Sequence, residues 1–169
     1  MRLSRRALLL GGAAAGIGAA AGLALQPTAH RAPRRALGVL DPVAFSTLAA
    51  AVDAICPAAH GAPDPWALQV PEAIDQVLAA ADPRAAAEVV QLLHALENGL
   101  AGFVLDQRPW SFTRSSDAGR AAALAAWRDS RLGPRRAGYH ALVALVSATY
   151  WSHPATWPHL GYPGPPRFG

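Results

Sequence analysis

The chain has 169 residues and a formal net charge of +4 at pH 7, but this charge is unevenly distributed. Residues 1–35 hold six arginines and no acid, whereas residues 36–169 hold nine arginines and eleven acids. The larger part therefore carries a net charge of −2 and has no basic excess to neutralise phosphates, which argues against nucleic-acid binding. The distribution is typical of a basic leader followed by one folded domain.

The start of the chain has the layout of an export signal, with a basic beginning and a long uncharged run. Two adjacent arginines precede residues 7–25, which are mostly Ala, Gly and Leu. This arrangement predicts a twin-arginine signal, the kind that carries folded proteins across a bacterial membrane. The residues that carry the prediction are Ser4, Arg5, Arg6, Leu8 and Leu9.

Two other interpretations of this leader stay open, a general secretion signal and an uncleaved membrane anchor. Residues 7–25 could just span a bilayer core of about 30 Å at about 1.5 Å per residue. The run is only weakly hydrophobic because Ala and Gly dominate it, which favours a signal. We expect the signal at residues 1–29 and a disordered or extended linker at residues 30–39.

The rest of the chain is divided by helix signals into about five predicted helices. Asp-Pro pairs at residues 41–42 and 82–83 each place an N-cap before a proline at the first helical position. Apolar residues then recur at helical spacing, and alternating runs that would predict strands are missing. We expect an all-α, irregular bundle at residues 40–151. The predicted helices cover residues 42–55, 70–81, 83–105, 117–127 and 135–151.

Residues 152–169 form a tail with five prolines and three glycines, which we expect to be extended and not helical. Its aromatic residues need an apolar surface, either the bundle itself or a partner subunit. Trp and Tyr dominate interface energetics, so we predict a partner interface at Trp66, Trp151, Trp157, Leu160 and Tyr162.

The sequence offers little chemistry of its own. Cys56 is the only cysteine, so it is either a buried small residue or one half of a bridge to a partner chain. Phosphate-loop, metal-binding and haem-attachment motifs are missing, and Asp53, Asp75 and Asp106 stand alone. We therefore expect no catalytic, cofactor or metal site in this chain.

Three passages together resemble the gluconate 2-dehydrogenase subunit 3 family. The first is Asp53-Ala54-Ile55-Cys56-Pro57, and the second is Val70-Pro71-Glu72-Ala73-Ile74-Asp75. The third runs from Tyr150-Trp151-Ser152-His153-Pro154 to Leu160-Gly161-Tyr162-Pro163-Gly164-Pro165 and is the most specific. The resemblance covers residues 40–165.

The resemblance implies the small accessory subunit of a membrane-associated bacterial dehydrogenase for sugars, polyols or sugar acids. In this family the small subunit binds a large FAD-containing subunit of the glucose–methanol–choline type, and a multihaem cytochrome c subunit usually takes the electrons through haem c. The large subunit lacks a signal and reaches the periplasmic side of the inner membrane on the small subunit's twin-arginine leader, through the translocase. No catalytic residue is carried over. The alternative is a stand-alone exported helical binding or structural protein.

Overall fold

The computed structural model describes residues 22, 26–56, 61–108 and 110–165. Six α-helices and one 3-10 helix lie within this part of the chain, and strands are missing from it, which confirms the predicted all-α bundle. The helices are α2 (Pro42–Ile55), α3 (Val70–Ala79), α4 (Pro83–Glu97), α5 (Gly99–Asp106), α6 (Asp117–Arg128), α7 (Gly133–Ser152) and η2 (Pro154–Leu160).

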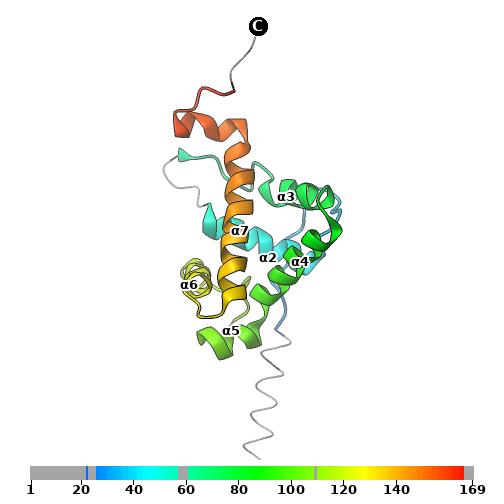
Figure 1. Ribbon diagram of the computed structural model, residues 1–169, viewed down its shortest axis with the longest axis vertical. Coiled ribbons are helices and arrows are strands. Elements are labelled where there is room, and N and C mark those ends of the chain that lie inside the picture. Colours follow the sequence, from blue (N-terminus) through cyan, green and yellow to red (C-terminus); the bar gives the residue numbers. More distant parts are fainter. Residues whose placement is uncertain (1–21, 23–25, 57–60, 109, 166–169) are drawn as a thin grey trace, which may run out of the picture.

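Helix α2 lies at the centre of the bundle, and α3, α4, α6 and α7 all pack against it. Every residue from Ala44 to Val52 is therefore buried, including the small and hydroxyl-bearing ones. Figure 1 shows α7 as the long upright helix that α2 crosses. The largest fully buried apolar side chains come from four helices: Phe45, Leu48, Ile74, Leu93, Leu96, Leu142 and Tyr150, with Phe112 from a loop.

The two Asp-Pro helix starts are confirmed. One carboxylate oxygen of Asp41 accepts hydrogen bonds from the N–H groups of Val43 and Ala44, at 2.9 and 3.0 Å. Asp82 does the same at the start of α4. These contacts satisfy N–H groups that have no partner inside the helix.

The predicted long helix over residues 83–105 is wrong in one respect, because it is divided at Asn98. The backbone of Asn98 is not helical, and its side-chain oxygen accepts a hydrogen bond from the N–H of Ala101 at 3.0 Å. This cap starts α5 in a new direction. Val104, on α5, is exposed.

The tail is helical at its beginning, which corrects the expectation of an extended segment. A 3-10 helix, η2, follows α7 after a single residue, and Nδ1 of His153 caps it by accepting from the N–H of Ala155. Thr156 is fully buried and donates its hydroxyl to the carbonyl of His153 at 2.7 Å. Pro154 is tolerated at the start of η2 because an N–H in the first turn has no acceptor inside the helix, whereas Pro158 lies inside η2.

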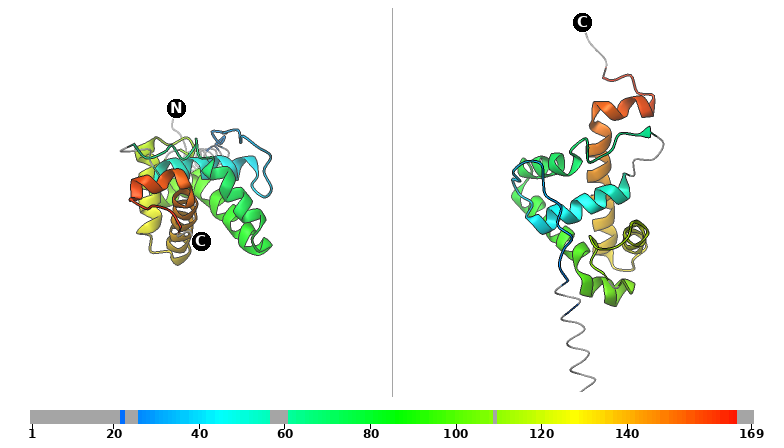
Figure 2. Two further views of the ribbon diagram at one scale, coloured as in Figure 1. Left: turned by 90° about the horizontal axis from the view of Figure 1, so that it is seen from above. Right: turned by 180° about the vertical axis from the view of Figure 1, so that it is seen from behind.

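The segment before α2, which the sequence predicts to be a disordered or extended linker, has neither helix nor strand over residues 26–41 and is packed on the bundle. We call residues 26–40 the N-terminal strap, drawn in blue in Figures 1 and 2. Its backbone N–H groups donate to side chains of the bundle: Ala29 to Thr113, Arg31 to Ser46, Arg34 to Glu72, and residues 38–40 to Asp75.

The predicted signal residues Ser4, Arg5, Arg6, Leu8 and Leu9 lie outside the described residues. Among the helices that are described, none combines the length and the apolar character needed to cross a bilayer.

Candidate interaction surfaces

Four of the five predicted interface residues lie around the junction of α7 and η2. We call Trp151, Trp157, Leu160 and Tyr162 the aromatic platform. Leu160 is 54% exposed, Tyr162 44% and Trp151 38%, while Trp157 is half-buried. The rings of Trp157 and Tyr162 meet edge to face with centroids 5.4 Å apart. The side chains of Leu160, Tyr162 and Trp151 thus stay open to solvent at this end of the chain.

The platform rests on a hydrogen-bonded base. Tyr150 is buried, and its hydroxyl donates to the carbonyl of Pro63 at 2.7 Å, which ties the end of α7 to the loop before α3. The N–H of Tyr162 donates to the carbonyl of Trp157 at 3.0 Å. Gly161 has a left-handed φ of 63°, and Gly164 lies against the Trp157 ring, where a Cβ would come within 3.2 Å. The chain therefore holds these side chains in place before any partner binds.

Trp66 lies apart from the platform. Its ring packs against Phe45, with centroids 6.4 Å apart, and is half-buried. The guanidinium groups of Arg31 and Arg34 lie over it, 4.6 and 5.1 Å from a ring centroid. Cation–π contacts of this kind hold the N-terminal strap against the bundle. Trp66 therefore has a role within the chain, at the strap.

Cys56 lies in the core at the end of α2. It is a free cysteine, and burial raises the pKa of its thiol to about 11. A thiol with so high a pKa is a poor nucleophile and a poor candidate for exchange with another thiol. This placement favours the interpretation as a buried small residue over that as a bridge.

The acids that stood alone in the sequence all have partners in the fold. Asp53 pairs with Arg31 at 2.8 Å, and Asp106 pairs with Arg135 at 2.6 Å. Asp75 receives the three strap N–H groups. Groups of three or more His, Cys, Asp or Glu side chains that could hold a metal ion are missing among the described residues. These acids stabilise the fold and the strap.

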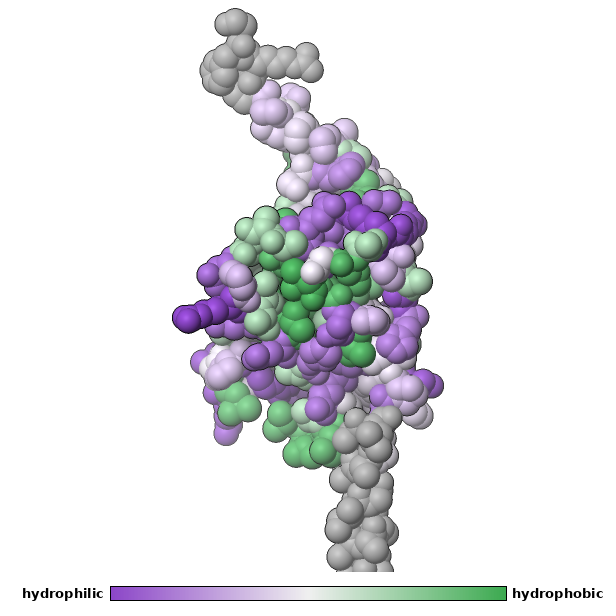
Figure 3. Space-filling model, turned by 90° about the vertical axis from the view of Figure 1, so that its right-hand side faces the viewer, coloured by the Kyte–Doolittle hydropathy of each residue, from purple (hydrophilic) through white to green (hydrophobic). Residues whose placement is uncertain are grey.

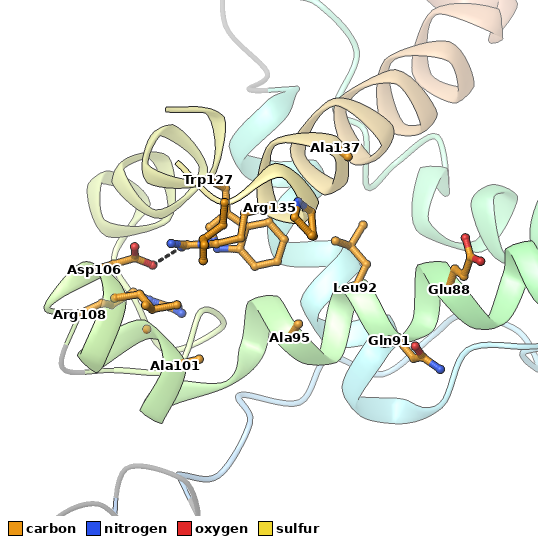
Figure 4. A pocket seen from close by; sticks show the side chains of 14 residues that line it. Glu88, Gln91, Leu92, Ala95, Ala101, Asp106, Arg108, Trp127, Arg135 and Ala137 are labelled. Carbon is orange, nitrogen blue, oxygen red and sulfur yellow. Dashed lines mark hydrogen bonds and ion pairs between the residues drawn. The ribbon is translucent and has the colours of Figure 1, made fainter. Parts of the chain in front are cut away.

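A second surface was not predicted. A cavity of about 570 Å³, which we call the α5 groove, opens between α4, α5, α6 and α7. Figure 4 shows its side chains, with the Asp106–Arg135 ion pair beside Trp127 and Arg108. Most of the lining is apolar, and it includes Leu92, Ala95, Leu105, Trp127, Leu132 and Pro134.

The α5 groove was not predicted from the sequence because it depends on the division of the helix at Asn98. A single helix over residues 83–105 would not turn α5 toward the start of α7. The signal available was Asn98 followed by Gly99, a pair that favours a helix break and a new cap. Leu105 and Leu132, both at helix ends, are about half exposed at its rim.

A third hollow lies on the face made by α3 and α4. It is a shallow cavity of about 420 Å³ whose walls include Val39, Leu78, Ala86 and Val90. Figure 3 faces this side and shows apolar surface gathered near its centre with polar residues around it. The strap forms one wall, so this hollow is a seam between the strap and the bundle.

The comparison with protein families finds a match. The family model described as gluconate 2-dehydrogenase subunit 3 matches residues 43–164, which is more than half of the chain and runs from the second residue of α2 to beyond η2. Neither the curated proteins nor the solved structures include a match. The matched range contains both the aromatic platform and the α5 groove. The chain belongs to the gluconate 2-dehydrogenase subunit 3 family, and it is an accessory subunit of a dehydrogenase complex.

Proposed function

We propose that this protein is the non-catalytic small subunit of a periplasmic, membrane-associated, FAD-dependent dehydrogenase for sugars, polyols or sugar acids. It binds the large flavoprotein subunit, of the glucose–methanol–choline type, and escorts it folded through twin-arginine export. FAD belongs to the partner, and haem c belongs to a cytochrome subunit that takes the electrons. The observation that carries this proposal is the exposed aromatic platform of a chain whose family is a subunit family.

The platform has the properties of a binding surface. Large exposed apolar side chains that lie together mark interaction sites, and burying one of them stabilises a complex by about 1.5–3 kcal/mol. Because Thr156, Gly161 and the Tyr150 hydroxyl already fix the backbone, little conformational entropy is lost on docking. A rigid aromatic anchor of this kind is typical of binding hot spots.

The N-terminal strap supports the export part of the proposal. A flavoprotein folds around FAD in the cytoplasm, so its signal must belong to a pathway that accepts folded cargo. The strap joins the leader to the folded domain from its first residues, since Gln26 accepts a hydrogen bond from the N–H of Ser111 at 2.6 Å. The strap thus fixes the position on the folded domain from which the leader extends.

The binding proposal is tested by co-producing the full chain with the flavoprotein subunit. Leu160→Asp combined with Tyr162→Asp places two charges on the platform. We expect this variant to lose the flavin absorbance that co-purifies with the tagged small subunit. Val77→Asp is the matched control, because Val77 is equally exposed but lies on α3, away from the platform. Retention of flavin by the double variant would favour the stand-alone exported protein.

The export proposal is tested in the leader. Replacing Arg5 and Arg6 with Lys keeps the charge but removes the arginine pair that the pathway requires. We expect the flavoprotein and its dehydrogenase activity to remain in the cytoplasm. Arg2→Lys is the control, since it changes an arginine of the same leader outside the pair. Periplasmic activity in the double variant would indicate a general secretion signal.

A further inference from the structure

We infer that the α5 groove is a second binding site for the partner subunit and that it takes an apolar segment carrying an aspartate or glutamate side chain. This inference rests on the proposed function, because it takes the flavoprotein subunit as the partner. The groove is lined by residues at the start of α7, whereas the aromatic platform lies around its end, and Figure 1 shows α5 and the last helical turns of the chain at opposite ends of α7. At about 1.5 Å per residue, the helix separates the two surfaces by roughly 30 Å.

The walls of the groove call for apolar groups. The cavity of about 570 Å³ is bounded by side chains such as Leu92, Ala95 and Trp127, with few polar atoms among them. Leu105 and Leu132 stand at its rim with 52% and 51% of their surface exposed. Val104, next to Leu105 on α5, is 68% exposed but does not line the cavity. An open apolar rim around a hollow fits a polypeptide better than a small ligand enclosed by it.

The guanidinium of Arg108, at the inner end of the groove, favours binding of a carboxylate. Arg108 is only 8% exposed, and one of its terminal nitrogens donates to the carbonyl of Leu96 at 3.0 Å. Its Nε and its other terminal nitrogen are buried without a hydrogen-bond partner. A buried cation that lacks acceptors is costly, so the site is incomplete as it stands.

The nearby acids do not complete it. Asp106 is engaged by Arg135 at 2.6 Å, and Glu97 accepts from the N–H and hydroxyl of Thr113 at 2.9 and 2.7 Å. Burial lowers the pKa of Arg108, and the charges of Asp106 and Glu97 only oppose that effect. Gly102 lies directly against the guanidinium, and a Cβ at this position would overlap it. The chain therefore makes room for a cation and leaves part of it unpaired.

These features together select the occupant. A purely apolar segment would leave Arg108 as it is, and a basic segment would place like charge beside Arg108. Glu88 also lines the groove, but Figure 4 shows it at the opposite end from Arg108. A carboxylate on an apolar segment supplies the missing acceptors, and guanidinium–carboxylate pairs are strong and directional. The apolar walls then contact apolar residues of the segment, and Arg108 pairs with an acidic residue close to them in the same segment.

The test uses the full chain and the flavoprotein subunit, with the Kd of their complex as the readout. Leu132→Asp should raise Kd by about tenfold or more, because it adds like charge where a carboxylate-bearing apolar segment docks. Val77→Asp should leave Kd unchanged, since Val77 is 50% exposed but lies outside the groove. Both side chains are half exposed, so neither change prevents folding.

Arg108→Met separates recognition from structure. If Arg108 pairs with a carboxylate only in the complex, an apolar side chain of similar length should leave the Tm of the free subunit unchanged or higher. The Kd for the flavoprotein subunit should rise by about tenfold or more. A lower Tm with an unchanged Kd would show a structural arginine and overturn the inference.

The outcomes also distinguish this inference from the proposed function. If Leu132→Asp binds like wild type while the platform variant does not, the groove is not a site and the proposed function stands. If both variants bind like wild type, both fail. If decanoate raises the Tm of the free subunit and Leu132→Asp leaves Kd unchanged, the groove takes a small acid and the inference is overturned.

Discussion

The carboxylate of Asp75 accepts a hydrogen bond from the backbone N–H of Leu40 at 2.9 Å, and both residues are buried. The same carboxylate also accepts from the N–H groups of Val39 and Gly38, at 3.0 and 2.7 Å. One turn earlier in α3, Glu72 accepts from the N–H of Arg34. The two acids of the Val70–Asp75 passage thus bind the N-terminal strap to the bundle.

Asp75→Asn should lower the free energy of unfolding by about 2–3 kcal/mol, because an amide group replaces an acceptor that faces buried N–H donors. Urea unfolding of the purified domain measures this change. Glu88→Gln is the control, since Glu88 is exposed on α4, and should change stability by less than about 0.5 kcal/mol. Equal stabilities for the two variants would contradict the role given to Asp75.

The local features of the fold could be predicted from the sequence, because their causes lie within a few residues. Asp41 and Asp82 cap the helices that their Asp-Pro pairs indicated, and the helix predicted at residues 117–127 is α6. The division at Asn98 also had a local cause, the Asn98-Gly99 pair. It was not predicted because the apolar periodicity indicated one continuous helix over residues 83–105. The 3-10 helix η2 was missed because proline content was taken as evidence against any helix.

Most of the long-range features could not be predicted. The pairing of Asp75 with residues 38–40 joins positions 35 to 37 apart, and that of Asp106 with Arg135 joins positions 29 apart. No pattern in the sequence marks these pairs. The platform was identifiable because its aromatic residues are close together in the chain. The α5 groove was not, because its walls come from four helices.

Tyr150→Phe should lower the free energy of unfolding by about 1–2 kcal/mol, because it leaves the carbonyl of Pro63 without its donor. The change also loosens the base of the aromatic platform. Urea unfolding gives the stability, and the Kd for the flavoprotein gives the effect on binding. Tyr162→Phe, on the exposed platform, controls for loss of a hydroxyl and should leave stability unchanged. A stable Tyr150→Phe variant would contradict the proposed base.

Asn98→Ala should lower the free energy of unfolding by about 1 kcal/mol, because it removes the side-chain acceptor that caps α5. Alanine also favours a continuous helix over residues 83–106, which would draw α5 away from the start of α7. Hydrogen exchange at the N–H of Ala101 is the direct measurement, and it should become faster. Asn98→Asp keeps the acceptor and should behave like wild type. Slow exchange in the alanine variant would show that the cap does not define α5.

Cys56 should react slowly in the folded protein. Its pKa of about 11, against an ordinary 9.0, lowers the thiolate fraction at about pH 8 by about 100-fold. Labelling with iodoacetamide should therefore be slow in buffer and fast in urea.

Because the pKa of the Cys56 thiol is higher in the folded chain, the thiol of the unfolded chain ionises first as pH rises. The stability due to the neutral thiol is thus full below about pH 9 and is lost by about pH 11. Cys56→Val removes this pH dependence and serves as the control. Rapid labelling of the folded chain, or a disulfide to a partner on a non-reducing gel, would restore the bridge interpretation.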